Sequence, residues 1–185
     1  MRTFVAVPVN AALQNVLISQ LATLQSQPWA SDVDWTPEKN WHLTLKFLGE
    51  LSAEQVEAIE RSMRDWFAEG MSYFEAELIA IKGFPQAQSG PFIVATLEAT
   101  LLLQALVREI EEQLRCFEIP KDRRAFRPHI TLGKWKGKPD AFPELEISLE
   151  ASWLRVDRLN LYESVQVEGR HQYKPLATYA LETYD

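Results

Sequence analysis

This sequence contains very little cysteine and has no long apolar run. Cys116 is the one cysteine among 185 residues, so an internal disulfide is excluded and a reducing compartment is expected. Because Cys116 falls in a helical pattern, we expect a small buried side chain rather than a nucleophile. No apolar run approaches the roughly 20 residues that cross a membrane. The sequence therefore predicts a soluble cytoplasmic protein that does not engage membranes.

Basic residues are outnumbered by acidic ones, and the formal net charge of −7 argues against a general nucleic-acid coat protein. Residues 121–138 depart from this balance with a single acid, Asp122, among seven basic side chains. These are Lys121, Arg123, Arg124, Arg127, Lys134, Lys136 and Lys138. Such a run of charged residues can be no more than a solvated face. That interpretation stays open beside the alternative, a rim that attracts anions.

Histidine is also scarce, yet two of the three histidines stand in nearly the same tetrapeptide: HLTL at residues 42–45 and HITL at residues 129–132. On a strand, side chains alternate between the two faces, so each histidine shares a face with the threonine two residues later. The intervening apolar residues then point into a core. Each motif thus presents an imidazole and a hydroxyl together.

The surroundings of the two motifs indicate a duplication. Residues 4–7 (FVAV) resemble residues 92–95 (FIVA), and each segment precedes an apolar helical pattern and then a histidine motif. The first pattern consists of Leu13, Val16, Leu17, Leu21 and Leu24; the second consists of Leu102, Leu106, Ile110 and Leu114. We therefore expect an α+β fold of two lobes related by a pseudo-twofold axis. Each lobe would have an antiparallel sheet with flanking helices, and the motifs would face each other across a central cleft.

Further elements complete this prediction. Asn10 is a candidate N-cap, and Ser52 to Gln55 resembles a capping box that opens another helix. Strands are expected over residues 74–81, 145–149, 153–162 and 172–181. We expect one domain over residues 1–185, with closely packed lobes of about residues 1–88 and 89–185 and with room for strands to be exchanged between them.

Two facing imidazoles fit the opening of a cyclic phosphodiester. This reaction needs a base for water and an acid for the leaving oxygen, and a pKa of about 6.5 allows both protonation states near neutral pH. Hydroxyl groups would stabilise charge on the phosphate oxygens. The scheme needs no metal or other cofactor, and the sequence contains neither a His-x-x-x-His nor a Cys-x-x-Cys spacing.

Residues 35–49 (WTPEKNWHLTLKFLG) closely resemble the first signature of the two-histidine (2H) phosphoesterases, and residues 126–132 (FRPHITL) resemble the second. Residues 2–7 and 161–164 are also similar to the bacterial and archaeal RNA 2′,3′-cyclic phosphodiesterase branch (LigT/ThpR type, formerly called 2′-5′ RNA ligases). One departure is Gly133-Lys134, where alanine and arginine are more usual. That change keeps the positive charge.

The resemblance implies a bilobal α+β fold that hydrolyses RNA 2′,3′-cyclic phosphate ends to 2′-phosphomonoesters. It implies that His42 is the proton donor and His129 the proton acceptor, and that Thr44 and Thr131 hold the phosphate. The remaining candidates for contact with RNA or phosphate are Arg127 and Lys134. The expected partner is RNA or an oligonucleotide, and no obligate protein partner is inferred.

Other functions remain open on the same scaffold. They are 2′-5′ RNA ligation or cleavage, opening of a small cyclic nucleotide phosphate, and nucleotide binding without catalysis. The large excess of water and the release of ring strain favour hydrolysis over ligation. Two intact histidines argue against a module that only binds, because binding alone does not need a paired acid and base.

Overall fold

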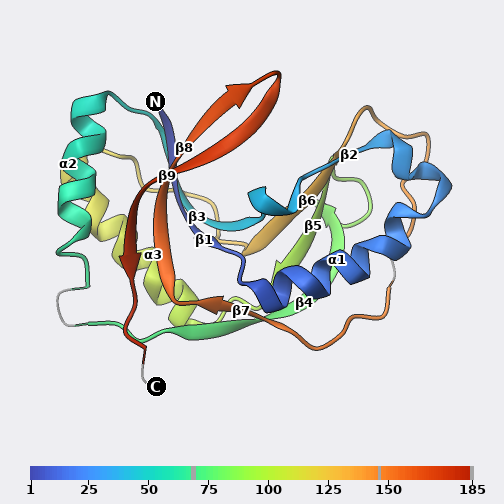
Figure 1. Ribbon diagram of the computed structural model, residues 1–185, viewed down its shortest axis with the longest axis horizontal. Helices are drawn as coiled ribbons and strands as arrows, with labels where there is room; N and C mark the ends of the chain where they lie inside the picture. Colours follow the sequence, from blue (N-terminus) through green and yellow to red (C-terminus); the bar gives the residue numbers. More distant parts are fainter. Residues whose placement is uncertain (68–69, 146, 184–185) are drawn as a thin grey trace.

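The computed structural model describes residues 1–67, 70–145 and 147–183, and these form a single mixed sheet-and-helix body around a nine-stranded antiparallel sheet (Figure 1). The strands are β1 (Arg2–Pro8), β2 (Val33–Trp35), β3 (His42–Glu50), β4 (Phe74–Phe84), β5 (Phe92–Leu97), β6 (His129–Trp135), β7 (Trp153–Val156), β8 (Arg158–Val167) and β9 (Arg170–Ala180). The helices are α1 (Ala11–Gln25), α2 (Ala53–Met63) and α3 (Leu101–Leu114), with short 3-10 turns η1 (Pro28–Asp32), η2 (Glu38–Asn40) and η3 (Arg115–Phe117).

The strand order places corresponding strands of the two repeats at matching distances from the centre of the sheet. It runs β7-β4-β5-β6-β3-β1-β8-β9, with β2 paired to β6. The two motif strands, β3 and β6, meet at the centre, and each is followed outward by the strand that begins its own repeat. The predicted α+β fold with two pseudo-twofold halves is confirmed. We call β1, β3, β8 and β9 the first half-sheet, and β4 to β7 the second half-sheet.

Neither half-sheet follows a division of the chain at residue 88. β4 lies before that point but pairs with β5, while β8 comes late in the chain but pairs with β1. Helix α3 is exchanged too, because it contacts β3 of the first half-sheet. In Figure 1, α1 runs on the side of β4 to β6, while α2 and α3 lie on the other side. The first half-sheet therefore combines strands from both ends of the chain, whereas the second is built from the consecutive strands β4 to β7.

The helices follow some of their predicted signals and depart from others. The capping box of α2 is confirmed: the Ser52 hydroxyl accepts from the Gln55 amide at 3.2 Å, and the Gln55 side chain accepts from the Ser52 amide at 2.9 Å. On α3 the buried face begins at Leu103, while Leu102 is exposed. The prediction for Cys116 was wrong, since it lies beyond α3 in η3 and is exposed. None of the helices in the described part of the chain is long and apolar enough to cross a membrane.

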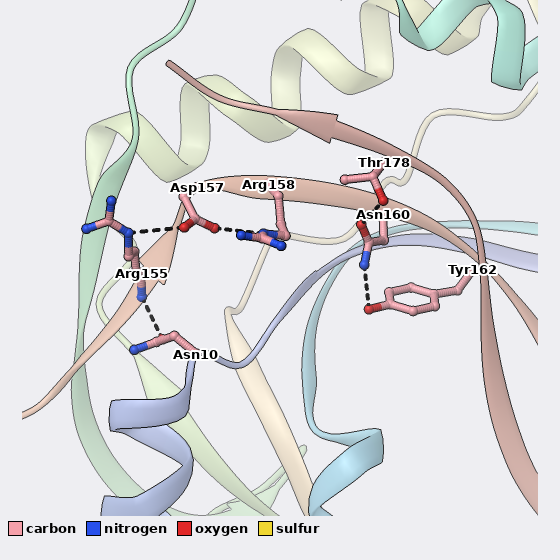
Figure 2. A network of polar contacts seen from close by, with 7 residues as sticks. All are labelled: Asn10, Arg155, Asp157, Arg158, Asn160, Tyr162 and Thr178. Carbon is pink, nitrogen blue, oxygen red and sulfur yellow. Dashed lines mark hydrogen bonds and ion pairs between the residues drawn. The ribbon is translucent and has the colours of Figure 1, made fainter. Parts of the chain in front are cut away.

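The predicted strand over residues 153–162 is divided at Asp157, where the chain leaves the second half-sheet for the first. Figure 2 shows its carboxylate between two guanidinium groups, with Arg155 Nε and Arg158 Nε both at 3.1 Å. Asn10 takes part in the same network. Its side-chain oxygen accepts from the Arg155 amide at 2.9 Å and makes no capping bond to α1. Asn10 thus stands at the predicted N-cap position of α1, but its side chain ties the start of the helix to β7.

The strand predicted over residues 145–149 is wrong for the residues that the structure describes there; residue 146 lies outside them. The apolar side chains of Leu145, Ile147 and Leu149 pack on the core without a partner strand. The alternation of apolar and polar residues here therefore arises because the apolar side chains face the core. The described backbone of this segment pairs with no other strand.

Candidate active site

The two histidine motifs meet at the centre of the sheet. Leu43 of β3 pairs with Ile130 of β6, and both side chains are fully buried. The histidine and threonine of each motif flank this pair, so they project from the opposite face of the sheet. In an antiparallel register the histidine of one motif lies across from the threonine of the other: His42 from Thr131, and His129 from Thr44. The register brings the four predicted groups together.

Both imidazoles are held in the same way, by a main-chain carbonyl two residues earlier. His42 Nδ1 lies 2.7 Å from the Asn40 oxygen, and His129 Nδ1 lies 2.6 Å from the Arg127 oxygen. A carbonyl only accepts, so Nδ1 carries the hydrogen in each ring and Nε2 is left for chemistry. His42 Nε2 also lies 3.0 Å from the Thr44 hydroxyl, which donates to it when the ring is neutral.

The surroundings favour the neutral form of each ring in the free protein. Burial lowers the pKa of His42 below its usual 6.5; the bond to the Asn40 carbonyl opposes this change, and the nearby His129 adds to it. Burial also lowers the pKa of His129, with the Arg127 carbonyl opposing and the Arg127 charge adding to the shift. His129 is therefore one of the groups that lower the pKa of His42.

An aromatic ring from an outer strand or loop lies against each imidazole. The ring of Tyr173 (β9) meets His42 edge-on, with centroids 5.0 Å apart, and Phe4 lies at the same distance in a tilted arrangement. On the other side, Phe84 stacks on His129 with centroids 4.1 Å apart. These contacts fix the ring planes, because each imidazole is bonded at Nδ1 and packed on a face or edge.

Both motif strands have a bulge at the same place. The register of β3 against β1 shifts between Val5 and Ala6, and the register of β6 against β5 shifts between Ile93 and Val94. An extra residue at Leu45 and at Leu132 reverses the alternation. The fifth residue after each histidine therefore lies on the same face as that histidine: Phe47 in β3 and Lys134 in β6.

Lys134 is a predicted site residue, and Phe47 was missed. The Phe47 side chain is 69% exposed, which is unusual for phenylalanine, and its ring centroid is 6.1 Å from that of Phe4. Lys134 is exposed, with Nζ 5.5 Å from the centroid of the Phe92 ring. Aligning the two repeats, His-x-Thr-x-x-Phe with His-x-Thr-x-x-Lys, would have identified Phe47 as the counterpart of Lys134.

Arg127 lies close to His129 but is already engaged. Its guanidinium carbon is 4.4 Å from the centroid of the Phe84 ring, and one terminal nitrogen donates to the Pro85 carbonyl at 2.7 Å. Within the basic segment, Arg124 pairs with Asp122 and Lys136 donates to the Ser31 carbonyl. All seven basic side chains of this segment are exposed. In the described ranges, no three His, Cys, Asp or Glu side chains are grouped as they would be around a metal ion.

Comparison with known proteins gives a consistent result. The chain matches the model of the 2′-5′ RNA ligase superfamily over residues 11–168. A Thermotoga maritima protein named RNA 2′,3′-cyclic phosphodiesterase is 28% identical over 95% of this chain and 93% of its own length. Among solved structures, a Thermus thermophilus protein has a TM-score of 0.80 at 24% identity, and Escherichia coli LigT in the apo form has 0.74 at 25%. Each of these two matches covers 98% of both chains.

Proposed function

Because this chain belongs to the 2′-5′ RNA ligase superfamily, we propose that it hydrolyses RNA 2′,3′-cyclic phosphate ends to 2′-phosphomonoesters by metal-independent acid–base catalysis. The activity is the one named for its Thermotoga maritima relative. The observation that carries the proposal is the matched placement of the two imidazoles. Both keep Nδ1 on a carbonyl and present Nε2 on the face shared by the two threonines.

In the proposed reaction His129 is the base and His42 the acid. Neutral His129 accepts a proton at Nε2 from a water molecule, whose oxygen attacks phosphorus. The bond between phosphorus and O3′ breaks, and protonated His42 gives its Nε2 proton to the departing O3′. A 2′-phosphomonoester remains and ring strain is released. Each transfer contributes about 10²–10⁴-fold to the rate.

The groups beside the histidines suit the rest of this substrate. The hydroxyls of Thr44 and Thr131 would donate to the non-bridging oxygens, and Lys134 would neutralise their charge. Since Arg127 is held against Phe84, it would act on the phosphate through its charge. On the other side, the exposed ring of Phe47 offers a stacking surface for the terminal base.

A direct assay tests the reaction itself. We expect an oligoribonucleotide with a 2′,3′-cyclic phosphate end to be opened in excess EDTA, with the product phosphate on O2′ by ³¹P NMR. A strict requirement for added metal would contradict the mechanism, and a 3′-phosphate product would contradict the assignment of the leaving oxygen. If only 2′-5′-linked or small cyclic substrates react, the substrate class is wrong.

The lowered pKa values of both histidines predict an acidic optimum for kcat/KM. The profile of kcat/KM reports the free enzyme, in which the base must be neutral and the acid protonated. Both pKa values lie below the usual 6.5, so both limbs and the optimum should lie below pH 6.5. A bound phosphate anion favours the imidazolium forms, so the kcat profile should be displaced to higher pH. Rate measurements across pH 4 to 9, about the range in which imidazoles titrate, would contradict this if the kcat/KM optimum lay above 6.5.

A further inference from the structure

The residue two positions before each histidine uses its side chain as well as its carbonyl. We propose that these are positioning residues, which fix the imidazoles by anchoring the carbonyls that hold them: Asn40 for His42 and Arg127 for His129. The inference rests on the proposed function, because it assigns a role in orienting the acid and the base. Neither residue would touch the reacting atoms in this role.

Asn40 is fixed at both ends. Its carbonyl accepts from His42 Nδ1 at 2.7 Å, and its side-chain amide donates to the main-chain carbonyl of His171 at 3.0 Å. The residue is 8% exposed, so water competes little for either bond. Asn40 ends the short turn η2, and β3 begins two residues later at His42. The hydrogen bond from the Asn40 side chain therefore connects the residues just before β3 with the start of β9.

Arg127 does the same with a different side chain. Its carbonyl accepts from His129 Nδ1 at 2.6 Å, and its guanidinium donates to the Pro85 carbonyl at 2.7 Å. The guanidinium also lies over the Phe84 ring, and the same ring stacks on His129. The entry to the second motif strand is thus tied to the loop that follows β4.

The two anchors share one more property. Each reaches the segment that also supplies an aromatic ring to the imidazole: Tyr173 lies two residues after the acceptor at position 171, and Phe84 lies one residue before Pro85. Carbonyl, anchor and ring therefore form one unit around each histidine. The two halves of the protein build this unit from different residues, as expected if the unit serves the imidazoles rather than local packing.

Loss of an anchor has a specific chemical consequence. A carbonyl that is free to turn no longer selects the tautomer with hydrogen on Nδ1, and the competing tautomer carries it on Nε2. In the neutral base, that tautomer cannot accept a proton from water. The hydrogen bond to the Asn40 carbonyl also raises the pKa of His42. Loss of this bond therefore lowers that pKa, and the protonated form of His42 that acts as the acid is lost at a lower pH.

Asn40→Ala tests the first anchor, and Asn160→Ala is its matched control. Asn160 is also 8% exposed, and its side chain bonds to Tyr162 and Thr178 (Figure 2). The Tyr162 ring lies 6.3 Å from the His42 ring between centroids, so this variant disturbs the packing beside His42 but leaves the Asn40 carbonyl anchored. We expect Asn40→Ala to lower kcat about 10- to 100-fold with little change in KM. The alkaline limb of kcat/KM should move to lower pH, and ¹⁵N NMR of the imidazole should report mixed tautomers of His42. Asn160→Ala should keep the His42 tautomer and the position of the alkaline limb, because the bond from His42 Nδ1 to the Asn40 carbonyl is unchanged.

Arg127→Ala tests the second anchor at an exposed position, where loss of the fold is not expected. A lower kcat with mixed His129 tautomers supports positioning; a higher KM alone would overturn it in favour of phosphate contact. If Asn40→Ala does not fold, Asn40→Ser takes its place. Unchanged kcat and tautomers, or the same tautomer change in Asn160→Ala, would refute the role of Asn40. Should the wild type not hydrolyse the cyclic phosphate, the proposed function fails, while the tautomer comparison still decides the positioning role.

Discussion

Replacing His129 or His42 with alanine is expected to lower kcat for a cyclic phosphate end by roughly 100-fold or more, because each proton transfer contributes about 10²–10⁴-fold. The double variant should lose less than the product of the two single losses, since the acid and the base act in the same step. Turnover of the oligonucleotide, measured at the pH optimum of each variant, checks both statements.

His171→Ala is the control for this comparison, as the third histidine of the chain. Its ring is exposed and bonds to the Ser164 hydroxyl, and the substitution keeps the main-chain carbonyl that Asn40 uses. We expect turnover within about twofold of the wild type, since surface substitutions rarely change the fold. Near-normal turnover in His129→Ala would remove it from the role of base, and the same result for His42→Ala would remove it from the role of acid.

The repeated tetrapeptide could be interpreted from sequence because a strand gives the same geometry wherever it occurs. Period-two alternation put His42 with Thr44 and His129 with Thr131, and the duplication predicted that the motif strands would face each other. The structure adds how they meet, through the Leu43 and Ile130 pair. The residue pattern of a strand predicts which side chains share a face, but it does not determine which strand pairs with it.

What sequence reasoning missed depends on local departures from regular alternation. The bulges at Leu45 and Leu132 reverse the faces of their strands, so strict alternation would bury Phe47 when its side chain is exposed. The strand expected over residues 153–162 is broken by Asp157, whose ion pairs occur where the chain changes half-sheets. Bulges and strand exchange depend on contacts with strands that are distant in the chain, so they cannot be predicted from the alternation within one segment.

The bulge in β3 has a second consequence, because it turns Lys46 toward the core. The Lys46 ammonium lies 2.9 Å from the Glu111 carboxylate of α3 and donates to the Pro120 carbonyl at 2.7 Å. The side chains of Lys46 and Glu111 are 5% and 12% exposed, respectively. Glu111 in turn accepts from the Asp122 amide. This ion pair therefore holds the start of the segment that leads to Arg127 and His129.

Lys46→Ala is expected to destabilise the protein by about 3–5 kcal/mol, because it leaves a carboxylate buried without its partner. The double variant Lys46→Met with Glu111→Leu should recover most of this loss, since apolar side chains of similar volume avoid the cost of burying both charges. Chemical denaturation gives both free energies of unfolding. The pair of Arg115 and Glu112, with side chains 78% and 62% exposed, is the reference: its removal should cost at most about 1 kcal/mol. An equally small loss for Lys46→Ala would mean that water reaches the Glu111 carboxylate, and the ion pair would then not be what holds the segment leading to His129.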